Sequence, residues 1–155
     1  MYKILFVCHG NICRSPMAEF IFNDLLERRG ITSARAESAA TSTEEIGNPV
    51  HRGTVRVLSR LGIDCSKKRA RQVTASDYDE YDLIVIMEEF NRSRLMRALK
   101  RSGDPQGKIH LLLDWSASPR DIDDPWYTGD FEKTFEEISE GCEGLLEELI
   151  RSGCV

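Results

Sequence analysis

The residues from Cys8 to Ser15 combine a nucleophile with groups that bind phosphate. They read Cys8-His9-Gly10-Asn11-Ile12-Cys13-Arg14-Ser15, with a thiol at the start and a guanidinium near the end. Backbone N–H groups around Gly10 and Asn11 can converge on an anion, and the fork of Arg14 can hold two phosphate oxygens. The same positive field favours the nucleophilic thiolate of Cys8, to which Ser15 could donate a hydrogen bond. The stretch therefore predicts a phosphate-binding loop that carries a nucleophile.

Cys8 alone would not support this prediction, because a free cysteine is often a small apolar residue of the core. The prediction depends on its neighbours. Arginine, glycine, asparagine and serine all fall within one turn that leads into a helix, and an inert core has no use for them there.

The hydrophobic pattern predicts the elements that position this loop. Residues 2–7 are almost continuously apolar, which is typical of a strand buried on both faces of a parallel sheet. Helical spacing then runs from Ser15 to a stop at Gly30, and a second helix is expected from an Asn48 cap to Gly62. Further strands are predicted at 34–40, 83–87 and 109–113, with helices at 91–99 and from 131 onward. Residues 114–129 are expected to form a long ordered loop.

Strands that alternate with helices predict a doubly wound α/β fold. We expect one three-layer domain over residues 1–155, with a four-stranded parallel twisted sheet of order 2-1-3-4 and helices on both faces. In such sheets the binding crevice lies at the carboxyl ends of the strands, where the winding reverses. The loop that begins at Cys8 follows the first strand and is expected to lie in that crevice.

Composition narrows the class of protein. A net charge of -5 disfavours nucleic-acid binding and acidic membranes, because phosphate backbones require a basic field. The cysteine count is 5, an odd number at irregular spacings, which favours reduced thiols over a disulfide scaffold. The apolar start is too short for a signal peptide, and no stretch is long enough to span a membrane. We expect a cytoplasmic enzyme without a cofactor, and without a metal, because the histidines lack ligand spacing.

The cysteine loop, extended to Val7 and Pro16, resembles the signature loop of the low-molecular-weight protein tyrosine phosphatases. Other stretches resemble segments of that family in the family's order, so the resemblance spans essentially the whole chain. These stretches are Ser38-Ala39-Ala40-Thr41-Ser42, Ile46-Gly47-Asn48-Pro49, Ala70-Arg71-Gln72-Val73 and Asp124-Pro125-Trp126-Tyr127.

The resemblance implies a reaction through a phosphocysteine. Cys8 would attack phosphorus, while Arg14 and the loop amides would hold the equatorial oxygens. Asp124 matches the family's general acid, which would protonate the leaving phenolate and then activate water. By itself Asp124 would be interpreted as an ordinary turn residue before proline. Asp121 and Asp123 lie close by, but neither precedes Pro125.

The resemblance also implies supporting residues. Asn11 and Ser38 would brace the loop by hydrogen bonds, and Trp126 and Tyr127 would form a wall of the substrate pocket, with a core position as the alternative. Cys13 could pair with Cys8 under oxidation, although a packing role fits nearly as well.

The chain departs from the family pattern at three pocket or loop positions. Lys68 stands where many relatives carry a histidine that fixes the loop serine, and a lysine donates but cannot accept. Either Lys68 joins a different network with Glu19 or it belongs to a solvated basic patch, and we favour the patch. The stretch Thr43-Glu44-Glu45 stands where eukaryotic relatives place an aromatic pocket wall, and Glu44 should repel acidic peptides. His9 replaces an apolar residue and could change the polarity of the pocket.

Three other functions have sequence features that separate them from a tyrosine phosphatase. An arsenate reductase of this fold needs additional cysteines in a mobile segment, and Cys65 stands alone in its region. A protein arginine phosphatase carries a smaller polar residue at the position of Ile12. A non-catalytic phosphate-binding module would be expected to lose Cys8 or Asp124. We therefore expect a phosphotyrosine-containing protein as the substrate and inorganic phosphate as an inhibiting product.

Overall fold

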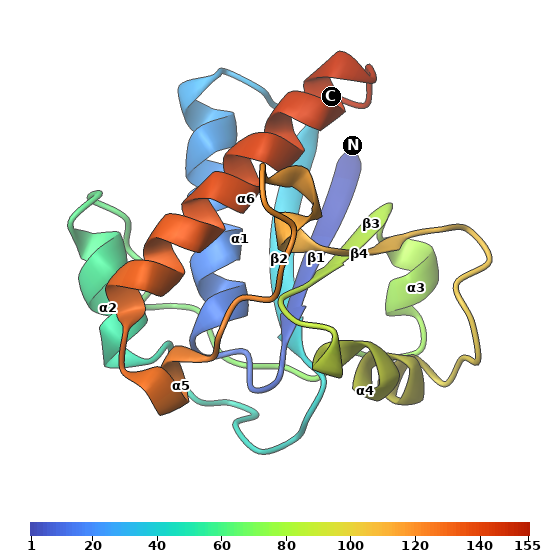
Figure 1. Cartoon of the computed structure of the whole chain (residues 1–155), viewed down its shortest axis with the longest axis horizontal. Helices are drawn as coiled ribbons and strands as arrows, with labels where there is room; N and C mark the ends of the chain where they lie inside the picture. The colour runs from blue at the N-terminus through green and yellow to red at the C-terminus, as the bar shows by residue number, and fades with distance from the viewer.

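The computed structural model describes all 155 residues and contains the predicted sheet. Figure 1 shows four parallel strands between two layers of helices, in the order β2-β1-β3-β4. The strands are β1 (Tyr2–Cys8), β2 (Ala34–Ala40), β3 (Leu83–Ile86) and β4 (Ile109–Leu111). The fold class and the strand order are therefore as the sequence predicted.

The long helices cover one face of this sheet and the shorter ones cover the other (Figure 1). On the first face lie α1 (Arg14–Arg28), α2 (Arg52–Ser59) and α6 (Phe131–Arg151). On the second face lie α3 (Asp77–Glu80) and α4 (Phe90–Leu99). Two short helical turns follow β4, namely η1 (Leu112–Trp115) and α5 (Pro125–Thr128). The sequence pattern missed α3, because four residues are too few to show a helical period.

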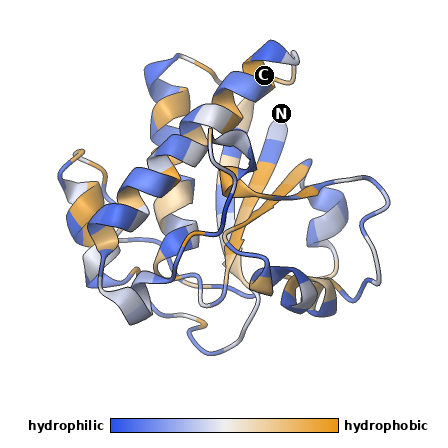
Figure 2. Cartoon of the chain, viewed as in Figure 1, coloured by the Kyte–Doolittle hydropathy of each residue, from blue (hydrophilic) through white to orange (hydrophobic).

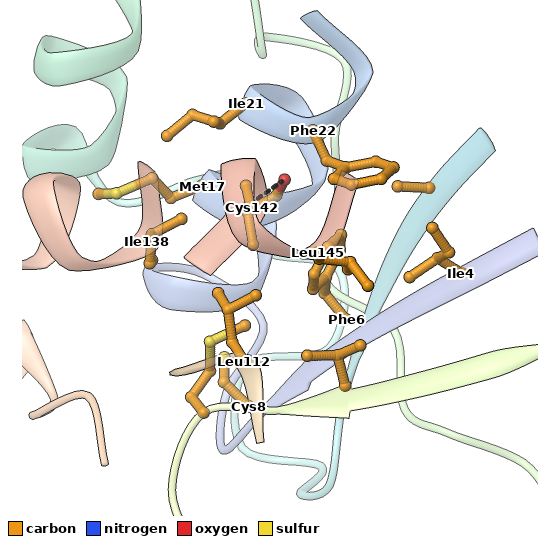
Figure 3. Close-up of a cluster of buried hydrophobic side chains, with 14 of the residues drawn as sticks. Ile4, Phe6, Cys8, Met17, Ile21, Phe22, Leu112, Ile138, Cys142 and Leu145 are labelled. Atoms are coloured by element: carbon orange, nitrogen blue, oxygen red, sulfur yellow. Dashed lines mark hydrogen bonds between the residues drawn. The ribbon is translucent and has the colours of Figure 1, made fainter. Parts of the chain in front are cut away.

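Two apolar clusters hold the layers together. The larger packs α1 and α6 on the sheet around side chains such as Phe6, Phe22 and Leu145 (Figure 3). The smaller packs α3 and α4 on the opposite face. The two central strands, β1 and β3, are the most continuously hydrophobic (Figure 2), as expected for strands covered on both sides. The edge strand β2 is less so, because it carries Arg35 and Glu37. All strands share one sheet, and we propose that residues 1–155 fold as one domain around it.

The predicted start of the second helix at Asn48 is wrong. Pro49 pairs with Arg69 in an antiparallel bridge, and the Ala70 amide donates to the Asn48 carbonyl (3.0 Å), so this backbone is extended. The helix begins instead at Arg52, where the His51 ring caps it by accepting from the Gly53 amide (3.0 Å). Tertiary pairing overrides the local Asn-Pro start signal here.

The fourth strand is also shorter than predicted, because it ends at Leu111 and not at Leu113. The Asp114 carboxylate accepts from the Leu111 amide (3.2 Å) and closes the chain into the η1 turn. Leu112 and Leu113 are fully buried after this turn, so their apolar character reflects core packing and not a strand.

The topology brings the chemically interesting segments to one end of the sheet. The loop between β1 and α1, the start of α4 and the segment with α5 all lie at the carboxyl ends of the strands (Figure 1). This is the end at which parallel α/β sheets bind ligands. No helix in the structure is long and apolar enough to cross a membrane.

Candidate active site

The sulfur of Cys8 lies at the centre of the loop between β1 and α1. It accepts backbone N–H groups from Asn11 (3.3 Å) and Ser15 (3.4 Å), and Ser15 Oγ lies 3.0 Å away. Asn11 adopts a left-handed conformation with φ of 59°, which asparagine tolerates better than most residues. This turn lets the loop wrap around the sulfur, where hydrogen bonds from three groups would stabilise a negative charge.

The loop also presents amide groups that have no acceptor inside the protein. The amides without an internal hydrogen bond are those of His9, Gly10, Ile12, Cys13 and Arg14. The last of them opens α1, so the partial positive charge of that helix adds to them. Such a run of donors beside a buried thiol is suited to binding the oxygens of a phosphate.

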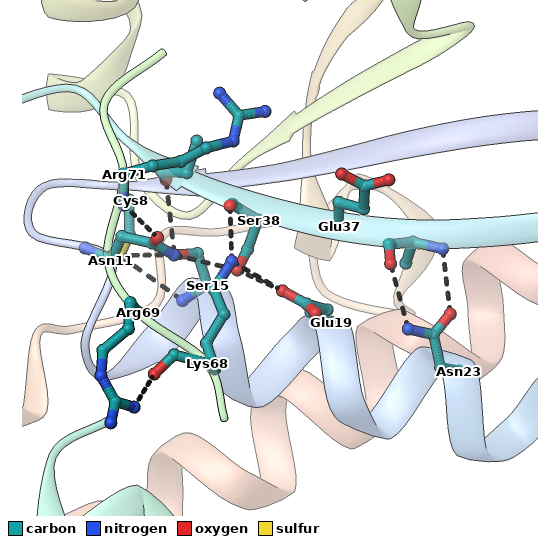
Figure 4. A network of polar contacts seen from close by, with 12 residues as sticks. Cys8, Asn11, Ser15, Glu19, Asn23, Glu37, Ser38, Lys68, Arg69 and Arg71 are labelled. Carbon is teal, nitrogen blue, oxygen red and sulfur yellow. Dashed lines mark hydrogen bonds and ion pairs between the residues drawn. The ribbon is translucent and has the colours of Figure 1, made fainter. Parts of the chain in front are cut away.

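A buried polar network holds the loop in place (Figure 4). The side-chain amide of Asn11 donates to Ser15 Oγ (2.8 Å) and to Ser38 Oγ (2.9 Å). Its side-chain oxygen Oδ1 accepts from the Arg71 backbone N–H (3.2 Å). Ser38 in turn donates to Glu19 (2.5 Å). Ser15 Oγ accepts from Asn11 and from the Cys8 thiol, and it donates over a long contact (3.5 Å) to the Ala39 carbonyl. When Cys8 is ionised, the Ser15 hydroxyl can turn this hydrogen to the sulfur. The structure thus brings together the residues that the resemblance placed as supports.

The solvated basic patch favoured from the sequence for Lys68 is wrong. Its side chain is only 14% exposed, and Nζ lies 3.2 Å from Glu19 Oε1 and donates to the Ser38 carbonyl (2.9 Å). Lys68 therefore ends the network by neutralising the carboxylate that receives the Ser38 hydroxyl. The alternative with Glu19 as partner is the one that the structure contains.

Arg14 is almost completely buried and has three oxygen partners. Its Nη1 donates to the Ile122 carbonyl (2.8 Å) and lies 3.1 Å from Glu88 Oε2, and its Nη2 lies 3.3 Å from Asp124 Oδ2. A buried guanidinium requires such partners, because an unpaired charge in the interior is very costly. Glu88 was not predicted from the sequence. Its place two residues beyond β3, at the carboxyl end of a central strand, was the available signal.

Asp124 reaches the pocket from the far end of the chain. It caps α5 by accepting from the Trp126 amide at Oδ1 (3.0 Å), and Pro125 opens that helix. This cap leaves Oδ2 directed toward Arg14. The two neighbouring acids are engaged elsewhere, since Asp121 accepts from the Glu89 amide and Asp123 lies 3.6 Å from Lys133.

The loop and the Asp124 segment enclose a pocket of about 210 Å³. Its lining residues are Cys8, His9, Gly10, Ile12, Cys13, Arg14, Glu44, Glu45, Asp124, Trp126 and Tyr127. Trp126 and Tyr127 are 55% and 82% exposed, so the alternative of a core position is wrong for both. The Trp126 ring lies edge-on to His51, with 5.6 Å between centroids, and this contact supports one wall.

Two other pocket residues, Glu44 and Cys13, are held in environments unlike that of Cys8. Glu44 contacts His9 Nε2 at the rim, so its carboxylate faces an imidazole. Cys13 is buried, and this burial, followed by the nearby Cys8, raises the pKa of its thiol far above the usual range. Burial therefore disfavours the thiolate form of Cys13. Glu45, which belongs to the same predicted stretch as Glu44, also lines the pocket beside Gly10.

The comparisons with known proteins agree with this geometry. The family model for low molecular weight phosphotyrosine protein phosphatase matches residues 3–153. The chain is 42% identical over 154 residues to the low molecular weight protein-tyrosine-phosphatase YfkJ of Bacillus subtilis, covering 96% of each chain. It is 39% identical over 149 residues to the low molecular weight phosphotyrosine protein phosphatase of Gallus gallus, covering 94% of each. The crystal structure of YfkJ superimposes with a TM-score of 0.92 at 41% identity, covering 98% of this chain and 96% of that one. The chain therefore belongs to this family of protein tyrosine phosphatases, as its motifs predicted.

Proposed function

We propose that the protein hydrolyses phosphotyrosine in phosphorylated proteins through a phosphocysteine intermediate. One observation carries the proposal: the Cys8 sulfur, the unpaired loop amides, Arg14 and Asp124 line a single pocket. A nucleophile, a phosphate-binding cradle and a proton donor are the groups that this reaction needs.

In the first step the Cys8 thiolate attacks phosphorus. A sulfur–phosphorus bond forms as the bond from phosphorus to the phenolic oxygen breaks. The loop amides and Arg14 hold the equatorial oxygens, whose charge they are placed to balance. Asp124, protonated, gives its proton to the leaving oxygen, which departs as neutral tyrosine. When Arg14 turns to the phosphate it keeps Glu88 and the Ile122 carbonyl as partners.

In the second step water releases the phosphate. Asp124, now a carboxylate, takes a proton from water as the water oxygen attacks phosphorus and the sulfur–phosphorus bond breaks. The Cys8 thiolate is a good leaving group because Ser15 and two amides stabilise it. The product is inorganic phosphate, which fits the same cradle, and we expect it to inhibit competitively.

The pocket walls favour an aryl phosphate. Trp126 and Tyr127 supply exposed aromatic surface on one side, and Ile12 supplies apolar surface within the loop. A phenyl ring packs well against such surfaces, whereas a phosphorylated guanidinium would leave polar N–H groups against them. We therefore favour phosphotyrosine over phosphoarginine.

The substrate is a phosphorylated protein, and we propose that neither nucleic acid nor membrane binds this chain. The net charge of -5 would repel both polyanions. We also propose that the enzyme works in the cytoplasm, because all five cysteines are free and Cys8 must stay reduced to act.

The proposal is tested by turnover of an aryl phosphate by three variants. Cys8→Ser should abolish activity, because a serine hydroxyl is far less acidic than a thiol and would not ionise here. Asp124→Asn should lower kcat by about 10²–10⁴-fold, the usual contribution of general acid catalysis. Asp123→Asn is the matched control and should retain activity, since this carboxylate is exposed and contacts only Lys133. Full turnover by Cys8→Ser would refute the mechanism.

Specificity is tested by offering phosphotyrosine and phosphoarginine peptides of the same sequence side by side. We expect higher kcat/KM for phosphotyrosine. A preference for phosphoarginine would show that the aromatic walls do not decide the substrate.

A further inference from the structure

A second groove adjoins the catalytic pocket on the side of α4. Its lining includes the exposed basic side chains Arg94, Arg97 and Lys100, all from α4 or the residue directly after it. The groove and the pocket share the lining residues His9 and Glu44, so the two depressions adjoin at these side chains. We refer to this feature as the α4 groove.

The three cations of the α4 groove have no carboxylate partner. Neither arginine nor the lysine lies within 4.0 Å of an acidic oxygen, although Arg92 on the same helix pairs with Glu89 (2.8 Å). Arg94 instead packs over the Phe90 ring, 4.4 Å from its centroid. Unpaired positive charges gathered on one face of a chain whose net charge is -5 create a local field that attracts anions.

The wall of the groove opposite α4 also has unused hydrogen-bonding capacity. Thr41 is 6% exposed, and its hydroxyl has no hydrogen-bond partner in the protein. Gln72 donates to the Thr41 carbonyl (3.1 Å), so the backbone there is satisfied while the hydroxyl is not. Buried polar groups are nearly always paired, and an unpaired one in a groove wall indicates that water or a ligand completes it.

Only one acidic side chain, Glu44, lines the groove, and it stands at the border with the pocket. Its carboxylate is turned toward His9. The negative charge therefore lies next to the phosphate pocket, while the unpaired cations lie further out along the groove. A ligand anion beyond Glu44 would meet net positive charge.

We propose that the α4 groove binds a second anionic group of the same substrate chain while phosphotyrosine occupies the pocket. The group is a carboxylate or a second phosphate ester a few residues away, because an extended peptide advances roughly 3.3 Å per residue. This inference deepens the proposed function and rests on it. It makes the preferred substrate an acidic or multiply phosphorylated segment, and it confines the repulsion expected from Glu44 to anions directly beside the phosphotyrosine.

The test compares three series of phosphotyrosine peptides with a small aryl phosphate. The peptides carry alanine, glutamate or a second phosphotyrosine at positions two to four residues before or after the target. The variant is Arg94→Ala/Arg97→Ala. The matched control is Arg28→Ala/Arg29→Ala, which removes the same charge at the far end of α1, where both arginines form exposed ion pairs.

We expect the Arg94 and Arg97 double variant to lower kcat/KM for the best glutamate peptide about threefold to tenfold, and more for the doubly phosphorylated one. Turnover of the aryl phosphate and of the alanine peptide should stay unchanged, and raising the salt concentration should remove the difference. The control variant should match the unaltered enzyme on every substrate. Glu44→Gln should raise kcat/KM for peptides with glutamate next to the target.

Two results would overturn the inference. One is equal kcat/KM for acidic and alanine peptides in the unaltered enzyme, and the other is a uniform loss on all peptides in the double variant. Both leave aryl phosphate turnover intact, whereas loss of the proposed function would show as no aryl phosphate turnover at all. The ratio of kcat/KM for the glutamate peptides to kcat/KM for the doubly phosphorylated peptides identifies which anion the groove prefers.

Discussion

Arg14 Nη2 lies 3.3 Å from Asp124 Oδ2, although one residue begins the first helix and the other follows the last strand. This contact closes the pocket between the cysteine loop and the α5 segment. Glu88 contacts the other nitrogen of the same guanidinium (3.1 Å). Two acids therefore contact the proposed phosphate-binding guanidinium: Asp124, the proposed proton donor, and Glu88, which has no part in the proposed proton transfer.

Glu88 should act as a positioning residue for Arg14. Glu88→Gln keeps the shape but removes the charge that holds the guanidinium, so kcat/KM for an aryl phosphate should fall about tenfold, mainly through misplacement of Arg14. Glu89→Gln is the matched control, because its carboxylate is exposed and pairs with Arg92. Steady-state kinetics of the two variants decide the matter. Equal activities would show that Glu88 does not orient Arg14.

Lys68 should stabilise the fold as well as the loop. Lys68→Met leaves Glu19 with a mostly buried, unpaired carboxylate, and the free energy of unfolding should fall by about 1–3 kcal/mol. Lys67→Met should cost little, because that side chain is exposed and makes no ion pair. Unfolding by denaturant measures the free energy of unfolding of both variants. The inference fails if the two variants are equally stable.

Gly144 lies where α6 crosses the η1 turn at close range. A Cβ added there would stand 1.9 Å from the Trp115 carbonyl oxygen, which is backbone and cannot rotate away. Gly144→Ala should therefore lower stability by about 1–3 kcal/mol, despite the better helix propensity of alanine. Gly103→Ala meets nothing within 4 Å and should be neutral. The measurement is thermal unfolding of both variants. If Gly144→Ala were the more stable of the two, the close packing of α6 on the η1 turn would be contradicted.

Asp104 should make stability depend on pH in the acid range. Burial alone would raise the pKa of its carboxyl, but hydrogen bonds from the Tyr78 hydroxyl (2.5 Å) and the Ile109 and Lys108 amides (each 2.9 Å) outweigh burial and lower it. A lowered folded pKa means that the stabilisation is fully present above the unfolded value of about 3.9 and is lost as the pH falls through the folded value.

The corresponding measurement is unfolding of Asp104→Asn at pH 7 and near pH 3. The variant should be less stable at pH 7 by about 1–3 kcal/mol. The difference should shrink toward pH 3, because the carboxyl of the unfolded chain takes up a proton at a higher pH than the carboxyl of the folded chain. Asp79→Asn, an exposed carboxylate without a side-chain contact, should show no such convergence. If the difference in stability between the variant and the unaltered protein stayed constant with pH, Asp104 would titrate alike in the folded and the unfolded state.

The sequence by itself determined the elements and the reaction loop. The apolar run before Cys8 has the predicted strand character because burial on both faces of a parallel sheet leaves a continuous apolar signal. Alternation of strands and helices then restricts the winding, and the winding places the Cys8 loop at the ligand-binding end. These inferences need only residues that are neighbours in the chain.

Tertiary structure decided the contacts between distant segments. Glu88 reaches Arg14, and Lys68 reaches Glu19. Pro49, beside Asn48, pairs with Arg69 in an isolated bridge instead of starting a helix. The family resemblance placed Trp126 in the pocket wall, but the residue type alone left a core position open, and only the folded chain decides between the two. A side chain's charge and size are local properties, but its partner depends on which segments the folded chain brings within a few ångströms.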